Sequence, residues 1–156
     1  MIELIPMNQE QITAVYHEAM EQDFPANELK PLRMILQLME SGDYDSLMIT
    51  NEGITVGYVL LMFPGREQVG LIDYLAIYPE QRSLGFGGKV LQKLKEYYPD
   101  GILYLECEHP TDAPKPQLAE RRIRFYERNG AVRIPLESKV FGAPLLSYGD
   151  SGKQTG

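Results

Sequence analysis

The feature that most constrains this chain is a glycine-rich segment at positions 81–91, which reads QRSLGFGGKVL. It follows a β-rich run that ends before Pro79 and precedes an apolar pattern with helical spacing. Glycines leave the backbone N–H groups of such a turn unobstructed, and the positive end of a helix dipole attracts anions. The segment therefore predicts a strand-to-helix turn whose backbone amides hold a phosphate group.

Two common phosphate-binding motifs do not fit this segment. A dinucleotide-binding G-x-G-x-x-G would need glycine three positions after Gly87, where the chain has Val90. A Walker A loop would need glycine at position 83, and serine or threonine directly after Lys89. The chain has Ser83 and Val90 there, so both of these nucleotide-binding classes are excluded.

The order of predicted elements indicates an α/β fold. A capping box of Asn8 and Gln11 predicts a helix that continues to Met20. Apolar periodicity and turn residues predict further helices over Lys30–Glu40, with Pro31 in the first turn, Gly85–Tyr98 and Gln117–Asn129. Strands are predicted over Ile2–Ile5, Tyr44–Thr50, Ile54–Phe63, Val69–Ile77, Ile102–Glu108, Val132–Ile134 and Ser138–Tyr148. This order predicts a mixed sheet with a right-handed β-α-β crossover in its second half.

Length and composition narrow the class of protein. The 156 residues suit one domain, expected over 1–148, with a disordered polar tail over 149–156. The single cysteine, Cys107, is expected in the core, and we predict no metal site and a reducing, cytoplasmic location without a membrane segment. The net charge of −7 argues against a nucleic-acid partner, whereas a backbone cradle binds a pyrophosphate whatever the net charge. That charge also favours the approach of a cationic amine.

The segment Arg82-Ser83-Leu84-Gly85-Phe86-Gly87 has the pattern R-x-x-G-x-G/A, and positions 125–130 read FYERNG. Over about Ile54–Gly130 the chain resembles the GNAT superfamily of N-acetyltransferases. The resemblance implies a mostly antiparallel central sheet flanked by helices, with a β-α-β coenzyme-binding core. It also implies that the acetyl group of acetyl-CoA is transferred to a primary amine by direct attack in a ternary complex.

The resemblance further implies a set of coenzyme contacts. Arg82 would lie beside the phosphates, and the backbone of Leu75, Ala76 and Ile77 would pair with the pantetheine arm like an added strand. The pyrophosphate would be held by the backbone amides of Ser83, Leu84, Gly85, Phe86, Gly87 and Gly88. A solvated loop arginine is the alternative interpretation of Arg82.

Three side chains are candidates for proton transfer. Tyr126 is at the position where the family commonly has the tyrosine that protonates the coenzyme A thiolate, although a core position beside Ile123 is the alternative. Glu106 is the favoured general base, and alternation places it on one strand face together with Glu108. Asp73 is the competing base. Its period-two pattern puts it on an apolar face unless a β-bulge changes its direction.

Some features leave the acceptor open. Ala119 stands where many family members have a coenzyme-binding asparagine, Ala131 replaces the final phenylalanine of the motif, and the loop over 109–116 is rich in proline. The acceptor is expected to be an amine-bearing small molecule or peptide, and a homodimer formed through the closing strands is an ordinary arrangement. The alternative function is a non-catalytic acyl-CoA-binding module, and replacement of Tyr126 distinguishes the two.

Overall fold

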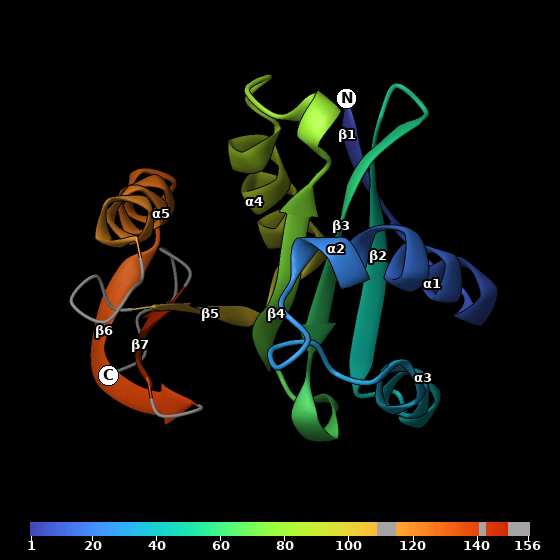
Figure 1. Cartoon of the computed structure of the whole chain (residues 1–156), viewed down its shortest axis with the longest axis horizontal. Coiled ribbons are helices and arrows are strands. Elements are labelled where there is room, and N and C mark those ends of the chain that lie inside the picture. Colours follow the sequence, from blue (N-terminus) through green and yellow to red (C-terminus); the bar gives the residue numbers. More distant parts are fainter. Residues whose placement is uncertain (109–114, 141–142, 150–156) are drawn as a thin grey trace.

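The computed structural model describes residues 1–108, 115–140 and 143–149, with side chains for 1–106 and 115–131. Its centre is a seven-stranded sheet with the strand order β1-β2-β3-β4-β5-β7-β6 (Figure 1). The strands are β1 Ile2–Pro6, β2 Tyr44–Asn51, β3 Ile54–Met62, β4 Val69–Ile77, β5 Ile102–Glu108, β6 Val132–Val140 and β7 Ala143–Gly149. Only the neighbours β4 and β5 are parallel, and every other neighbouring pair is antiparallel. This confirms the predicted mixed, mostly antiparallel sheet.

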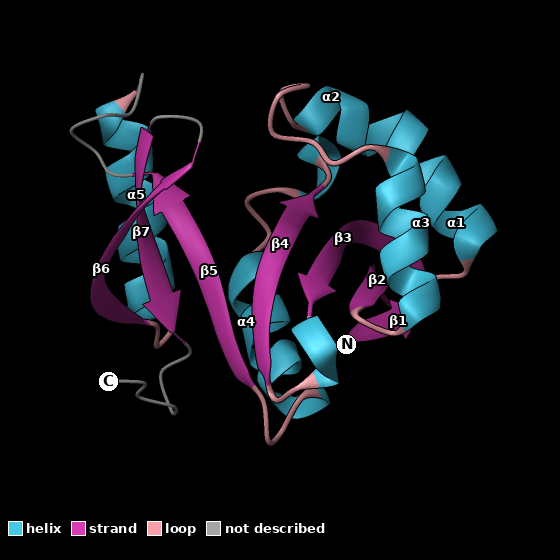
Figure 2. Ribbon diagram, turned by 90° about the horizontal axis from the view of Figure 1, so that it is seen from below, coloured by secondary structure: helices cyan, strands magenta, loops and turns pink. Residues whose placement is uncertain are grey.

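Helices cover both faces of the sheet. The helices α1 Gln9–Val15, α2 Glu21–Asp23 and α3 Leu32–Ser41 lie on one face, and α4 Phe86–Tyr97 lies on the other (Figure 2). The helix α5 Pro116–Arg128 lies beside β5, on the same side as α4. The crossover β4-α4-β5 is the β-α-β unit that the sequence predicts. We call the two sides of the sheet the α1/α3 face and the α4 face.

The strand β3 explains why the sheet is covered on both sides. Its residues 56–61 are all buried, and from Tyr58 to Leu61 the side chains alternate between the two faces. Val59 and Leu61 pack against Val90 and Leu94 of α4, whereas Tyr58 and Leu60 belong to the core beneath α1 and α3. A continuous apolar run of this kind is typical of a central strand buried on both faces.

The strands β4 and β5 separate along their length. Their ladder has three pairs, from Val69–Ile102 to Leu71–Tyr104, and the strands diverge beyond it (Figure 2). On the other edge of β4 the register with β3 shifts, because Leu60 pairs with Tyr74 and Leu61 with Ile72. Asp73 is therefore the extra residue of a β-bulge. The diverging strands leave an opening in the middle of the sheet, and the bulge lies where the opening begins.

Several predicted boundaries need correction. The first helix does not run uniformly to Met20, because a π-helical turn occupies Tyr16–Met20. The second helix begins at Leu32, since Pro31 has an extended ψ of 142° and serves as its N-cap. The prediction of a single strand over 138–148 is wrong, because Val140 pairs with Ala143 and the segment forms two strands of a hairpin. The capping box of Asn8 and Gln11 is confirmed by reciprocal hydrogen bonds of 2.8 and 2.9 Å.

The other closing element also differs from expectation. The strand predicted over 132–134 continues to Val140, with a register shift between Ile134 and Glu137 where Pro135 lacks an N–H donor. Gly149, expected at the start of the tail, ends β7. The rest of the predicted tail and the prolines of the loop at 109–114 lie outside the described residues.

Candidate active site

The glycine-rich turn connects β4 to α4 at the open end of the two parallel strands. Ser83 and Gly85 both have positive φ, at 68° and 78°, and Gly85 is the N-cap of α4. Gly85 has no side chain that could cap the first turn of this helix, and a Cβ on Gly85 would meet nothing within 4 Å. Uncapped N–H groups at an exposed helix start fit an anion such as a pyrophosphate.

The two following glycines have a packing role as well. A Cβ on Gly87 would lie 2.8 Å from the ring of Phe125, and a Cβ on Gly88 would lie 2.7 Å from Oδ1 of Asn129. Both contacted residues belong to the FYERNG segment at the end of α5. The two segments that carry the family resemblance therefore pack against each other, and of these three glycines Gly85 is the one that faces open space.

The segment of β4 that is predicted to pair with pantetheine is hydrogen-bonded to a neighbouring strand on one side. Leu75, Ala76 and Ile77 pair with β3, while the described ladder with β5 ends at Leu71. Tyr78 donates its N–H to Val56 of β3, so by alternation the backbone groups of Leu75 and Ile77 face the opening. Arg82 is exposed and its Nε donates to the carbonyl oxygen of Ile77 over 3.0 Å. This contact places the guanidinium group between the strand end and the glycine turn.

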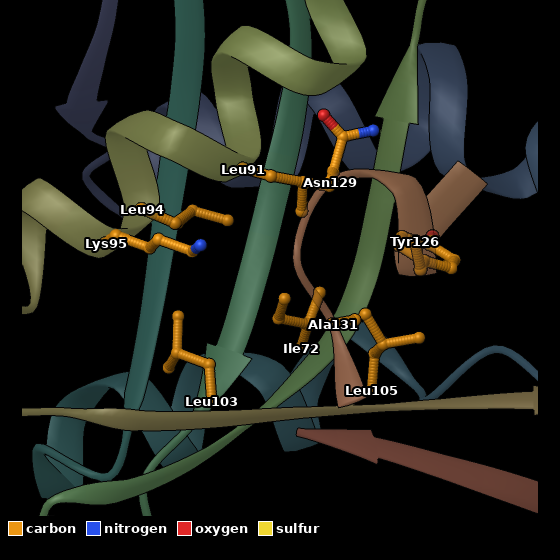
Figure 3. Close-up of a pocket in the computed structure, with 9 residues that line it drawn as sticks. All are labelled: Ile72, Leu91, Leu94, Lys95, Leu103, Leu105, Tyr126, Asn129 and Ala131. Atoms are coloured by element: carbon orange, nitrogen blue, oxygen red, sulfur yellow. The ribbon is translucent and has the colours of Figure 1, made fainter. Parts of the chain in front are cut away.

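Tyr126 lines an apolar pocket on the α4 face of the opening (Figure 3). The pocket is formed by side chains of α4, β4, β5 and the end of α5: Ile72, Leu91, Leu94, Lys95, Leu103, Leu105, Tyr126, Asn129 and Ala131. The Tyr126 ring is half-buried and meets the ring of Phe125 edge-on, with the centroids 5.3 Å apart. The structure thus brings Tyr126 next to the separation of β4 and β5.

Asp73 faces the opposite side of the sheet from this pocket. Because of the bulge, Asp73 and Tyr74 both turn toward the α1/α3 face, while Ile72 remains on the α4 face. Its carboxylate oxygen Oδ2 accepts hydrogen bonds from Lys30 Nζ and from the Tyr44 hydroxyl, each 2.7 Å long. The carboxylate is 12% exposed. The bulge therefore resolves the conflict that alternation predicted for an acidic residue in this strand.

Glu106 lies across the opening from Asp73. Its neighbour Leu105 contributes to the pocket on the α4 face, so alternation directs Glu106 to the α1/α3 face, where it is exposed. It lies two residues beyond Tyr104, the last β5 residue paired with β4. The side chains of Cys107 and Glu108 lie outside the described residues. Two of the candidate carboxylates thus flank the opening on one face, and the candidate tyrosine lies on the other.

The tyrosines around Asp73 are held in their neutral form. Burial, followed by the nearby Asp73 carboxylate, raises the pKa of Tyr44 far above its usual value. Burial likewise raises the pKa of Tyr74 to about 12, and its hydroxyl donates to the carbonyl of Glu28 over 2.9 Å. Tyr44 thus acts as a hydrogen-bond donor to Asp73 throughout the neutral pH range.

Sequence reasoning missed the partners of Asp73. Lys30 and Tyr44 are 43 and 29 residues away from it in the chain, and no local pattern links them. It also missed the Tyr58 hydroxyl, buried in β3, which donates to the Asp23 carboxylate of α2 over 2.7 Å. Five tyrosines gather beneath the first helices, namely Tyr16, Tyr44, Tyr58, Tyr74 and Tyr78. An excess of tyrosine over phenylalanine in apolar positions was the available signal.

Three features together define an acetyltransferase fold. The sheet opens between its two parallel strands, a glycine turn without a side-chain cap lies at the open end, and candidates for proton transfer lie on both faces. A sequence model of the Acetyltransferase (GNAT) family matches residues 12–131. The chain belongs to this family. The match covers the glycine turn, β4, β5 and the FYERNG segment.

Individual relatives agree with this assignment. The chain is 28% identical over 113 residues to a Bacillus subtilis (strain 168) protein named "Putative acetyltransferase YjbC", and the match covers 72% of this chain and 54% of YjbC. The chain thus spans about half the length of that relative. A Bacteroides thetaiotaomicron structure titled as a putative acetyltransferase from the GNAT family superposes with a TM-score of 0.80 at 19% identity, covering 97% of this chain and 88% of the other.

A second solved structure is a Vibrio cholerae spermidine N-acetyltransferase in complex with CoA and spermine. It superposes with a TM-score of 0.68 at 11% identity, covering 95% of this chain and 94% of the other. At these identities both superpositions establish the shared fold.

Two further features bear on cofactors and membranes. Within residues 1–108, 115–140 and 143–149, no helix combines the length and apolar character that crossing a bilayer requires. In the same part of the chain, no group of three or more histidine, cysteine, aspartate or glutamate side chains is arranged to hold a metal ion.

Proposed function

We propose that this chain transfers the acetyl group of acetyl-CoA to a primary amine by direct attack in a ternary complex. The observation that carries the proposal is the placement of Tyr126 and Asp73 on opposite faces of the opening between β4 and β5. A thioester in that opening would have a proton donor on one side and a carboxylate on the other. Acetyl-CoA supplies the activated acyl group.

The proposed binding mode follows the exposed backbone groups. The amides of residues 83–88 would hold the pyrophosphate at the start of α4, with Arg82 beside it. The backbone of Leu75 and Ile77 would pair with the pantetheine amides, since this edge of β4 has no described strand next to it. The apolar pocket next to Ile72 would exclude water from the thioester end.

Proton transfer divides between the two faces. An amine must be neutral to attack a carbonyl carbon, and an alkyl ammonium has a pKa of about 10.4 in water. Asp73 would accept the amine proton from the α1/α3 face, where its carboxylate is hydrogen-bonded to the Tyr44 hydroxyl. Tyr126 would donate its phenolic proton to the departing thiolate on the α4 face. Glu106, exposed across the opening, is the alternative base.

The acceptor follows from charge and position. The chain carries a net charge of −7, and Asp73 and Glu106 lie on the α1/α3 side of the opening. This arrangement favours a cationic amine of a small molecule or peptide. The Vibrio cholerae neighbour, titled as a spermidine N-acetyltransferase, makes polyamines the first acceptors to test. A cytoplasmic location and a homodimer stay predictions.

Replacement of Tyr126 by phenylalanine tests the mechanism. With a panel of polyamines, amino sugars and lysine peptides, and detection of released thiol, we expect Y126F to lower turnover by about 10²-fold with unchanged coenzyme A affinity. The matched control is Y97F, because Tyr97 is an exposed tyrosine of α4 outside the pocket. Equal turnover in the wild type and Y126F would remove Tyr126 from the mechanism.

The same panel separates catalysis from binding without turnover. If the wild type binds coenzyme A but releases no thiol with any acceptor or with water, the chain acts as an acyl-CoA-binding module. A transferase instead gives thiol release that depends on the acceptor and on Tyr126.

A further inference from the structure

Lys30 lies in the segment between α2 and α3, and its backbone is fixed from both sides. Its N–H donates to the Tyr74 hydroxyl over 2.9 Å, and its carbonyl accepts a hydrogen bond of 2.8 Å from the Tyr16 hydroxyl. The following residue, Pro31, restricts the backbone further. These contacts fix the backbone position from which the Lys30 side chain extends, whereas a typical surface lysine has no such contacts.

The Lys30 side chain ends at the candidate base. It runs over the Tyr74 ring, with Nζ 5.8 Å from the ring centroid, and Nζ donates to Asp73 Oδ2 over 2.7 Å. The side chain is only 25% exposed. Lys30 therefore presents an alkyl ammonium group at the carboxylate that marks the start of the β4–β5 opening.

An acceptor amine needs to lie beside the general base and close to the thioester, and Lys30 Nζ lies beside Asp73 at the start of the opening. Asp73 is the extra residue of the bulge, and its neighbour Ile72 lines the pocket that Tyr126 shares on the other face. A thioester between β4 and β5 would thus lie next to Asp73. The amine already hydrogen-bonded to Asp73 belongs to Lys30.

We propose that Lys30 is an acetyl acceptor of this chain, so that the protein acetylates its own Lys30. This inference rests on the proposed function. In the reaction Lys30 Nζ gives a proton to Asp73 and forms a bond to the carbonyl carbon of acetyl-CoA. The nitrogen then releases its second proton to solvent, the carbon–sulfur bond breaks, and the thiolate takes a proton from Tyr126. The products are N-acetyl-lysine at position 30 and coenzyme A. Asp73 then releases its proton to solvent and Tyr126 regains one, so that the reaction releases one proton overall.

Acetylation would change the site itself. The product is a neutral amide, so the ion pair between Lys30 and Asp73 is lost. The carboxylate keeps its hydrogen bond from Tyr44 and becomes available to the ammonium group of a second amine. The resident lysine also indicates the substrate class, which is an unbranched alkyl ammonium that can enter beside Tyr74 and reach Asp73.

The test is mass spectrometry of the purified full chain after incubation with acetyl-CoA. Cleavage after glutamate gives a peptide over 29–40 that contains Lys30 as its only lysine. Lys93 is the matched internal control, because it is 31% exposed and its Nζ lies 3.6 Å from Glu96 on the outside of α4. We expect an increment of one acetyl group at Lys30, formed at least tenfold faster than at Lys93. The rate per molecule should not depend on protein concentration.

Three variants make the result decisive. K30R keeps a cation beside Asp73 and should lose the label at position 30, whereas K93R should leave that label unchanged. D73N should slow labelling of Lys30 about tenfold or more, with folding of each variant checked by thermal unfolding. Labelling spread over exposed lysines at equal rates, or Lys30 labelling unaffected by D73N, would overturn the proposal.

The outcome also separates the two proposals. If free amines are acetylated while Lys30 stays unmodified, the self-acetylation proposal is overturned and the proposed function stands. If coenzyme A does not bind and no amine is acetylated, the proposed function is overturned, and the assignment of Lys30 falls with it.

Discussion

Two clusters, one at the closed end of β4 and one where the β4–β5 opening begins, contain the same kinds of groups in different settings. At the closed end, where β4 pairs with both neighbours, the Asp45 carboxylate accepts two hydrogen bonds of 2.9 Å from Arg66 and one of 2.6 Å from the Tyr98 hydroxyl. At the start of the opening, Asp73 accepts one bond from Lys30 and one from Tyr44. Each cluster is one aspartate, one cation and one tyrosine hydroxyl.

The difference lies in the cation and in the neighbouring strands. The Arg66 guanidinium is permanently charged, binds both carboxylate oxygens and also lies over the Phe63 ring, 4.7 Å from its centroid. A lysine gives one bond here and can lose a proton. The arginine cluster suits a fixed joint between β2, the β3–β4 connection and the end of α4. The lysine cluster suits a site where the partner of a carboxylate must change.

The largest expected effect is a difference in acetyl transfer rate between variants of Asp73 and Asp45. We expect D73N to lower the acetyl transfer rate about 10²-fold, because the amide cannot accept the amine proton. D45N, the matched change at the closed end, should leave the rate of the folded protein within about twofold. Steady-state thiol release with the best acceptor measures both. If E106Q gives the large loss and D73N does not, Glu106 is the base.

The next largest effect is on stability, and here we expect the larger loss at the closed end. D45A removes three hydrogen bonds and leaves the Tyr98 hydroxyl without its acceptor, so we expect the free energy of unfolding to fall by about 2–3 kcal/mol. Thermal unfolding should show this as a decrease in Tm of roughly 5–10 °C. Coenzyme A affinity should be unchanged in D45A. An equal loss of affinity would show that the closed end takes part in binding.

Two glycines sharpen the comparison further. A Cβ on Gly70, at the closed end, would lie 2.4 Å from the Phe63 ring, so G70A should cost about 2 kcal/mol through overpacking. A Cβ on Gly85 meets nothing within 4 Å, and its φ of 78° alone should make G85A cost about 1 kcal/mol. Urea unfolding of the two variants measures the order. A larger loss for G85A would contradict the open surroundings of that turn.

The last effect is a shared response to alkaline pH. Burial raises the pKa of Tyr74 to about 12 and the pKa of Tyr98 above its usual value. The unfolded chain therefore loses these protons first, near pH 10, so stability is full below about pH 10 and falls as pH rises toward 12. Y74F should flatten this fall by about 1–2 kcal/mol, as measured by urea unfolding at pH 9 and pH 11.5. An unchanged slope would contradict the burial of the Tyr74 hydroxyl.

Local signals explain the parts of the fold that the sequence predicts well. Gly42 ends α3 with a φ of 86°, and Asn8 opens α1 with a capping box, so both boundaries follow from one or two adjacent residues. The strand-turn-helix at Gly85 is equally local. The hairpin of β6 and β7 differs from the predicted short and long strands, because the apolar pattern of that segment does not locate its reversal.

The candidate site was predictable in its glycine turn and in its tyrosine segment, both of which carry sequence motifs. The direction of Asp73 depends on a register shift between β3 and β4, and its partner Lys30 comes from 43 residues away. The packing of Gly87 and Gly88 against α5 is also a long-range contact. Motifs therefore indicated the coenzyme side, whereas the acceptor side required the three-dimensional arrangement.

The central claim is that the open end of β4 and the glycine turn bind acyl-CoA. Isothermal titration of coenzyme A into the wild type and into G85V tests it most directly, since valine at a φ of 78° would displace the turn. We predict saturable binding to the wild type, at least tenfold weaker binding to G85V, and wild-type affinity in D45A. No binding heat at millimolar coenzyme A, or equal affinity in G85V, would contradict the claim.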